Sequence, residues 1–81
     1  MNSIKERLLD HAGVRDFAEA MKAKLDLKRE QGRGGWHDPE QCSLERLYIL
    51  LADHVRKGDM VDIGNLAMMI WNRERDAKDK S

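Results

Sequence analysis

A run of charged and amide side chains interrupts the most apolar part of this 81-residue chain. Its members are Asp53, His54, Arg56, Lys57, Asp59, Asp62 and Asn65. Carboxylates one turn apart on neighbouring helices share a face and can hold a hard divalent cation such as Mg²⁺. Asp53, Asp59 and Asp62 are therefore candidate metal ligands, and they would be the catalytic residues if the protein is an enzyme.

The same acids also have a purely structural interpretation. Asp59 followed by Asp62 is typical of a helix N-cap with an acidic residue in the first turn. Asp53 with Arg56 or Lys57 would form an ordinary surface ion pair, which contributes little to stability. Both interpretations stay open at the level of the sequence.

Two further side chains need partners. Asn65 lies in an apolar stretch, and a buried amide must be hydrogen-bonded, either across a subunit axis or to a ligand. Trp36 lies in a glycine-rich segment, residues 31–41, where the backbone must turn. This Trp either anchors the loop under the helices or stacks on the ring of a ligand.

A mildly basic strip precedes this loop. Residues 22–33 hold the cations Lys22, Lys24, Lys28, Arg29 and Arg33 against two acids. Guanidinium and ammonium groups are the usual ligands of phosphate. This strip is nevertheless too mixed in charge to be a polybasic arm.

Two helices are expected before the loop. Ser3 and Glu6 form a capping-box pattern for a short helix over residues 4–11, and Gly13 is expected to stop it. A second helix is expected over residues 15–30. Its apolar stripe is narrow, which indicates a helix that rests on a core by one edge: Phe17, Met21 and Leu25.

Two more helices are expected after the loop, as an antiparallel pair. Ser43 would cap a helix over residues 44–57 that Gly58 ends, and Asp59 would cap a helix running to residue 75. The tail, residues 76–81, is expected to fray. Both helices are apolar almost all round, so we expect a second copy to cover them in an intersubunit helical bundle. Gly64 would be explained by the close approach of another backbone.

The amino-acid composition and the pattern of helices indicate the fold class. The chain is predicted to be one all-α domain, residues 1–81, with a short N-terminal helix plus three helices. Fifteen basic residues balance fifteen acidic ones, which argues against a nucleic-acid binder. The lone Cys42 gives neither a disulfide framework nor a zinc site. The sequence shows no signal peptide and no membrane-spanning run, so we expect a cytoplasmic protein with no membrane partner.

Two stretches carry a resemblance to a known family. The first contains Phe17-Ala18, Met21, Lys24-Leu25, Arg29, Gly32 and Gly34-Gly35-Trp36, and the second runs from Val61-Asp62-Ile63-Gly64-Asn65 to Ile70. Together they resemble short phage and prophage proteins related to the MazG-like all-α nucleotide pyrophosphohydrolases, including those labelled dATP/dGTP pyrophosphohydrolase. The resemblance covers about residues 17–73. It implies an oligomer of helix pairs that hydrolyses nucleoside triphosphates with Mg²⁺ held by four acids.

Carried over by position, Asp53 matches the first acid of that family, while Asp59 and Asp62 match the third and fourth. Arg56 stands where the second acid should be, and Asn65 matches a polar position after the last. The cation at Arg56 competes with a metal ion but suits a phosphate group. The resemblance therefore implies nucleotide binding without a complete set of metal ligands.

Three functions follow as hypotheses. The first is an oligomeric phage-type protein that sequesters a nucleotide or cyclic-nucleotide signal without hydrolysis and so antagonises a host defence, in the host cytoplasm. In this hypothesis Trp36 stacks on the base, and the cations that bind the phosphate are Lys24, Arg29, Arg33, Arg56 and Lys57. The second is an Mg²⁺-dependent nucleoside triphosphate pyrophosphohydrolase. The third is a protein–protein inhibitor of a host enzyme, which needs no cofactor and for which a host defence protein is a candidate partner.

Overall fold

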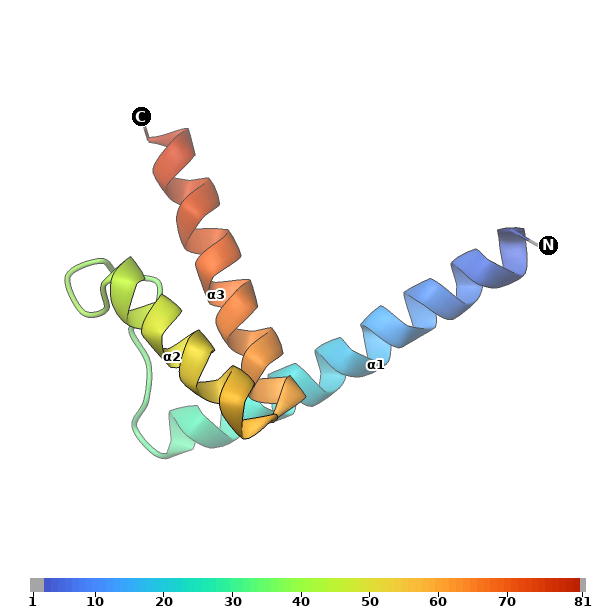
Figure 1. The fold of residues 1–81 in the computed structure, drawn as a ribbon, viewed down its shortest axis with the longest axis horizontal. Coiled ribbons are helices and arrows are strands. Elements are labelled where there is room, and N and C mark those ends of the chain that lie inside the picture. The colour runs from blue at the N-terminus through green and yellow to red at the C-terminus, as the bar shows by residue number, and fades with distance from the viewer. Residues whose placement is uncertain (1–2, 81) are drawn as a thin grey trace.

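The computed structural model describes residues 3–80, which form three α-helices joined by one long and one short connection. These are α1 (Ser3–Glu30), α2 (Leu44–Lys57) and α3 (Met60–Asp79). Figure 1 shows α2 and α3 as an antiparallel hairpin, with the C-terminal part of α1 crossing its closed end. The N-terminal part of α1 projects away from the hairpin. The prediction of an all-α fold is confirmed.

Local capping chemistry defines both ends of α2. The hydroxyl of Ser43 accepts a hydrogen bond from the backbone N–H of Arg46 at 3.0 Å. Gly58 adopts the left-handed conformation with φ of 80° and donates its N–H to the carbonyl of His54 at 2.9 Å. Glycine adopts this conformation without steric cost, so it ends the helix and allows α3 to begin at once. The predicted bounds of this helix are confirmed.

The prediction of four helices is wrong, because Gly13 does not end a helix. It lies inside the continuous helix α1, and the described glycines with positive φ are Gly32, Gly35 and Gly58. A glycine inside a helix costs about 1 kcal/mol relative to alanine. Propagation of the helix adds one hydrogen bond per residue, and residues 3–30 contain no proline. One glycine is therefore not enough to break the segment.

The last helix is also longer than expected. It continues to Asp79, so residues 76–79, which were expected to fray, are helical. Arg75 is ion-paired to Asp76 at 3.1 Å, and the residues that follow Asp76 include no glycine or proline. Charged residues with good helix propensity can continue a helix that packing has already started.

The core lies inside the α2–α3 hairpin. Leu47 from α2 and Leu66 and Ile70 from α3 are its fully buried apolar side chains. The partly buried side chains packed against them are Trp36, Cys42, Leu44, Leu50, Leu51 and Met69. Helix α1 contributes no fully buried side chain, which confirms that it rests on the hairpin by one edge.

The chain is extended for its size. Its radius of gyration is 15.0 Å, against about 12 Å for a compact domain of this length. Its accessible surface is 6418 Å², against about 5,000 Å² for a monomer of 9.4 kDa. The single chain therefore exposes roughly 1,400 Å² more surface than folded monomers of its mass do.

Within residues 3–80, no helix combines the length and the apolar character needed to cross a lipid bilayer.

Candidate functional site

A cavity of about 490 Å³ lies between the C-terminal end of α1, the long loop and the helix hairpin. It is lined by Leu25, Lys28, Arg29, Arg33, Gly34, Gly35, Trp36, His37, Cys42, Leu47, Leu50, His54, Asp62, Asn65, Leu66 and Met69. Small-molecule sites typically enclose about 300–1,000 Å³ with mostly apolar walls and a few polar groups. This cavity has both properties.

Arg73 fixes the loop that forms one wall of the cavity. Its Nη1 atom donates hydrogen bonds to the backbone carbonyls of Trp36 and Cys42, each at 2.8 Å. Both carbonyls belong to the loop, whereas Arg73 belongs to α3. One guanidinium therefore holds the two halves of the loop against the hairpin.

Asp38 shapes the turn within the same loop. Its carboxylate accepts the backbone N–H of Glu40 at 2.9 Å and the side-chain amide of Gln41 at 3.1 Å. These two hydrogen bonds, the backbone one first, hold the pKa of Asp38 below its usual value. The turn leaves Trp36 half-buried and packed on the core. Its ring is nearly perpendicular to the ring of His37, with 5.8 Å between the two ring centroids. Trp36 thus anchors the loop and also lines the cavity.

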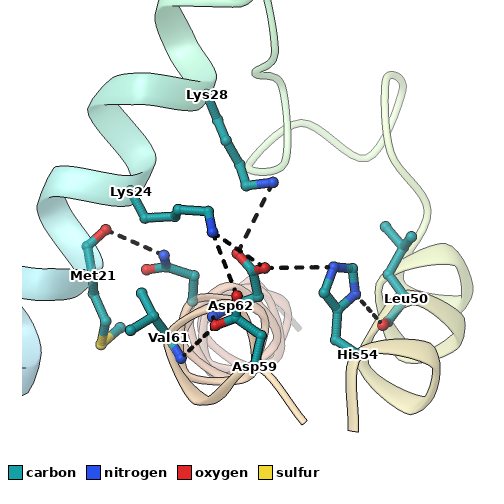
Figure 2. A network of polar contacts seen from close by, with 9 residues as sticks. Met21, Lys24, Lys28, Leu50, His54, Asp59, Val61 and Asp62 are labelled. Atoms are coloured by element: carbon teal, nitrogen blue, oxygen red, sulfur yellow. Dashed lines mark hydrogen bonds and ion pairs between the residues drawn. The ribbon is translucent and has the colours of Figure 1, made fainter. Parts of the chain in front are cut away.

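Asp62 brings the basic end of α1 onto the start of α3, as Figure 2 shows. Its carboxylate lies 3.5 Å from Nζ of Lys24, 3.9 Å from Nζ of Lys28 and 3.9 Å from Nε2 of His54. The side chain of Asp62 is only 12% exposed, so its carboxylate has lost most of its water. The ammonium groups of Lys24 and Lys28 compensate its charge.

The ring of His54 is oriented by the backbone of its own helix. Its Nδ1 lies 2.9 Å from the carbonyl oxygen of Leu50, which can only accept, so Nδ1 carries a proton (Figure 2). In the neutral ring, Nε2 is then an acceptor that faces the Asp62 carboxylate.

Asp59 caps α3 and shares one of these cations. Its Oδ1 accepts the backbone N–H groups of Val61 at 3.1 Å and Asp62 at 3.2 Å, and its Oδ2 lies 3.5 Å from Nζ of Lys24 (Figure 2). The hydrogen bond from the backbone of Asp62 is the main reason that the pKa of Asp59 is lowered, with the charge of Lys24 adding to it. The predicted N-cap is confirmed.

Asn65 is a buried polar side chain on the cavity wall. It is 4% exposed, and its Nδ2 donates to the carbonyl of Met21 at 3.2 Å. Its Oδ1 is buried and has no hydrogen-bond partner among the described residues. A buried acceptor without a partner costs free energy, so such a group marks a place where a donor from outside the chain would be stabilising.

The predicted ligand residues fall into two groups. Arg29, Arg33, Trp36 and Asn65 are brought together around the cavity, and Lys24 lies beside it through its contact with Asp62.

Arg56 and Lys57 belong to the other group, on the exposed side of α2. They pair with Asp53 at 2.8 Å and 3.0 Å, and neither lines the cavity. Hydrogen bonds from Lys57 and then Arg56 lower the pKa of Asp53. The arrangement matches the surface-pair interpretation of these three residues.

The described residues do not form the metal site that the resemblance implies. Asp59 and Asp62 lie together at the start of α3, where Lys24 contacts both, whereas Asp53 is occupied by its own two cations. Among residues 3–80, no three His, Cys, Asp or Glu side chains gather in a way that could hold a metal ion. This donor set does not fit Mg²⁺, which prefers several oxygen ligands in octahedral geometry.

Lys28, His54 and Arg73 were not among the predicted site residues, although two of them line the cavity and the third holds its wall. Lys28 follows Leu25 by three residues, and this spacing places it on the apolar face of α1. Arg73 follows Ile70 by three in the same way. A cation that continues the buried stripe of a helix was the signal available in the sequence.

The chain matches no known protein family, no curated protein and no solved structure with which it was compared.

Proposed function

We propose that the cavity binds a nucleotide or a closely related phosphorylated ligand. The main support is that Arg29, Arg33 and Trp36 surround one cavity. Its wall also holds the Oδ1 of Asn65, which has no hydrogen-bond partner among the described residues. An aromatic ring, a pair of guanidinium groups and a hydrogen-bond acceptor are the groups that recognise a base and its phosphate.

The charges around the cavity suggest how the proposed ligand is oriented in it. Asp62 and Asn65 lie deep, at 12% and 4% exposure, whereas the side chain of Arg29 is 69% exposed. The deeper cations Lys24 and Lys28 are already paired with Asp62, so a phosphate is attracted mainly to the arginines at the edge. The ring of the ligand would therefore point inward, where Asn65 can accept a hydrogen bond from an amino group, and the phosphate outward.

We propose binding without hydrolysis as the activity. Among the described residues, Asp53 lies apart from Asp59 and Asp62 and pairs with its own two cations. The groups suited to a base and a phosphate, by contrast, line one cavity. Together with the resemblance to phage proteins, this favours sequestration of a nucleotide or cyclic-nucleotide signal as the biological role, in which the protein removes a messenger from solution.

Isothermal titration calorimetry against linear nucleotides and cyclic mono- and dinucleotides tests this proposal. Arg33→Ala and Trp36→Phe should each weaken binding about tenfold, as expected for the loss of a charge-assisted hydrogen bond or of stacking area. Arg56→Ala is the matched control, because this arginine lies outside the cavity, and it should leave the affinity unchanged. Absence of heat with every nucleotide would refute the proposal.

We also propose that the hairpin associates with a second copy through its outer face. Tyr48 and Val55 on α2 and Met60 and Trp71 on α3 are between 47% and 62% exposed. Apolar surface of this extent on a small protein is typical of an interaction site. Trp71→Glu should lower the mass measured by sedimentation equilibrium, and an unchanged mass would remove this face from the proposal.

A further inference from the structure

The N-terminal arm of α1, residues 3–16, projects from the rest of the chain as a helix (Figure 1). Its apolar side chains Leu8, Leu9 and Val14 are 65%, 57% and 70% exposed. Most of the stability of a helix in a protein comes from the packing of its apolar side chains, and these three have little packing within the chain. The arm is therefore the part of the fold that most needs a partner.

We propose that the arm packs antiparallel against the arm of a second copy of this chain. The inference extends the self-association proposed above to a different surface, and it does not depend on nucleotide binding. It rests on the exposed surface, on the residue spacing along the arm and on the charge pattern.

The surface available matches what such an interface needs. The chain exposes roughly 1,400 Å² more than folded monomers of its mass, and a standard protein interface buries about 800 Å² on each partner. The projecting arm is the most evident source of the excess. Covering one face of it with a partner helix would bring the exposed area of each chain toward the ordinary value.

The spacing along the arm defines one stripe. Lys5, Leu9, Ala12 and Asp16 follow one another at intervals of four, three and four residues, which is the heptad spacing of packed helices. In an antiparallel pair centred between residues 10 and 11, Leu9 of one arm lies over Ala12 of the other. Gly13 beside Ala12 widens the space that receives this leucine.

Gly13 supports this register independently. Apart from the backbone of its own helix, no atom of the described residues lies within 4 Å of where its Cβ would be, so no contact among them explains a glycine inside this helix. Small residues at one position of a helix allow a second helix to approach closely. Ala12 and Gly13 together provide such a position at the middle of the arm.

The charges of the arm are complementary to themselves in this register. Lys5 near one end of the stripe faces Asp16 near the other end of the partner's stripe, and the twofold axis produces this pair twice. A parallel pair would place Lys5 against Lys5 and Asp16 against Asp16. Like charges directly opposite one another disfavour that arrangement, so the charge pattern selects the antiparallel one.

Sedimentation equilibrium of the full chain tests the inference. Leu9→Glu should weaken self-association about tenfold or more, because it places a carboxylate at the centre of the contact. Val14→Glu is the matched control, since Val14 is also exposed, at 70% against 57% for Leu9, but lies on the opposite side of the arm, and it should leave the mass unchanged. Leu9 packs on nothing in the core, so urea unfolding of the monomer should be unaffected by either change.

Charge reversal tests the direction of pairing without touching an apolar residue. Lys5→Asp and Asp16→Lys should each weaken association about two- to fivefold, and the double variant should restore it. If Trp71→Glu lowers the mass while Leu9→Glu does not, the arm pairing is wrong and the hairpin interface stands. A single-chain mass at every concentration would overturn both.

Discussion

The ring of Phe17 on α1 packs directly over Gly64 on α3. A Cβ at position 64 would lie 2.5 Å from Cζ and 2.6 Å from Cε2 of that ring. The sequence predicted that another backbone comes close to Gly64, but the neighbour is an aromatic side chain. The absence of a side chain at Gly64 therefore makes room for the ring of Phe17, and this contact positions α1 on the hairpin.

This contact predicts a reversal of the usual effect of replacing a helical glycine. Helix propensity alone would make Gly64→Ala stabilising by about 1 kcal/mol. Because the added methyl displaces the ring of Phe17, we expect that gain to be cancelled or reversed. In a Phe17→Ala background the same change should recover its full benefit. Urea unfolding of the four proteins gives the coupling, and additive effects would contradict the packing described.

The core is small enough for one truncation to matter. Leu47 is 2% exposed at its centre, so Leu47→Ala should cost about 2–5 kcal/mol. Ile49 on the same helix is 53% exposed, and Ile49→Ala should change stability by no more than about 0.5 kcal/mol. Equal losses in chemical denaturation would mean that the core lies elsewhere.

Removing the guanidinium of Arg73 should free the loop. Arg73→Met keeps the apolar stem but leaves the carbonyls of Trp36 and Cys42 without their donor, at a cost of about 2–3 kcal/mol. Trp36 should become more exposed, which fluorescence quenching in a Trp71→Phe background would report. The proposed nucleotide affinity should fall with it. Unchanged quenching would show that the loop is held by other contacts.

Acid should weaken the junction between α1 and α3 through Asp59. Its pKa is lowered in the folded protein, mainly by the backbone N–H of Asp62, so the fold favours the charged carboxylate. The stabilisation is complete above the unfolded-state pKa of about 3.9 and is lost as the pH falls through the lower folded value. Asp59→Asn keeps a capping acceptor but cannot titrate. Unfolding free energies across this range should therefore fall more steeply with acid in the unmodified protein than in the variant.

The α2–α3 hairpin was predictable because its helix ends are set by capping residues that act locally. Ser43, Gly58 and Asp59 act on backbone groups within four residues of themselves, so their roles could be read from the chain, and the hairpin followed. Gly13 carried the same local signal as Gly58 but not the same outcome. A glycine ends a helix only when the residues after it have a lower free energy outside the helix than they would have as its continuation.

The site was less predictable because its contacts join distant segments. Asp62 was placed correctly at the start of a helix, but its cations come from α1, more than thirty residues earlier in the sequence. One wall of the cavity is a loop that Arg73, from a distant part of the sequence, holds against α3. Arg29, Arg33, Trp36 and Asn65 could be selected by residue type, whereas the separation of Arg56 and Lys57 from them depends on which side of α2 faces outward.

Helix α1 is one rod with the cavity at one end and the arm at the other. The arm extends about 20 Å beyond Phe17, since each helical residue adds about 1.5 Å. Contacts with α3 run along residues 17–28 of this helix, from Phe17 against Gly64 to Lys28 beside Asp62. Because the arm continues this fixed part of the helix, the packing of α1 on α3 also sets the direction in which the arm presents Leu9.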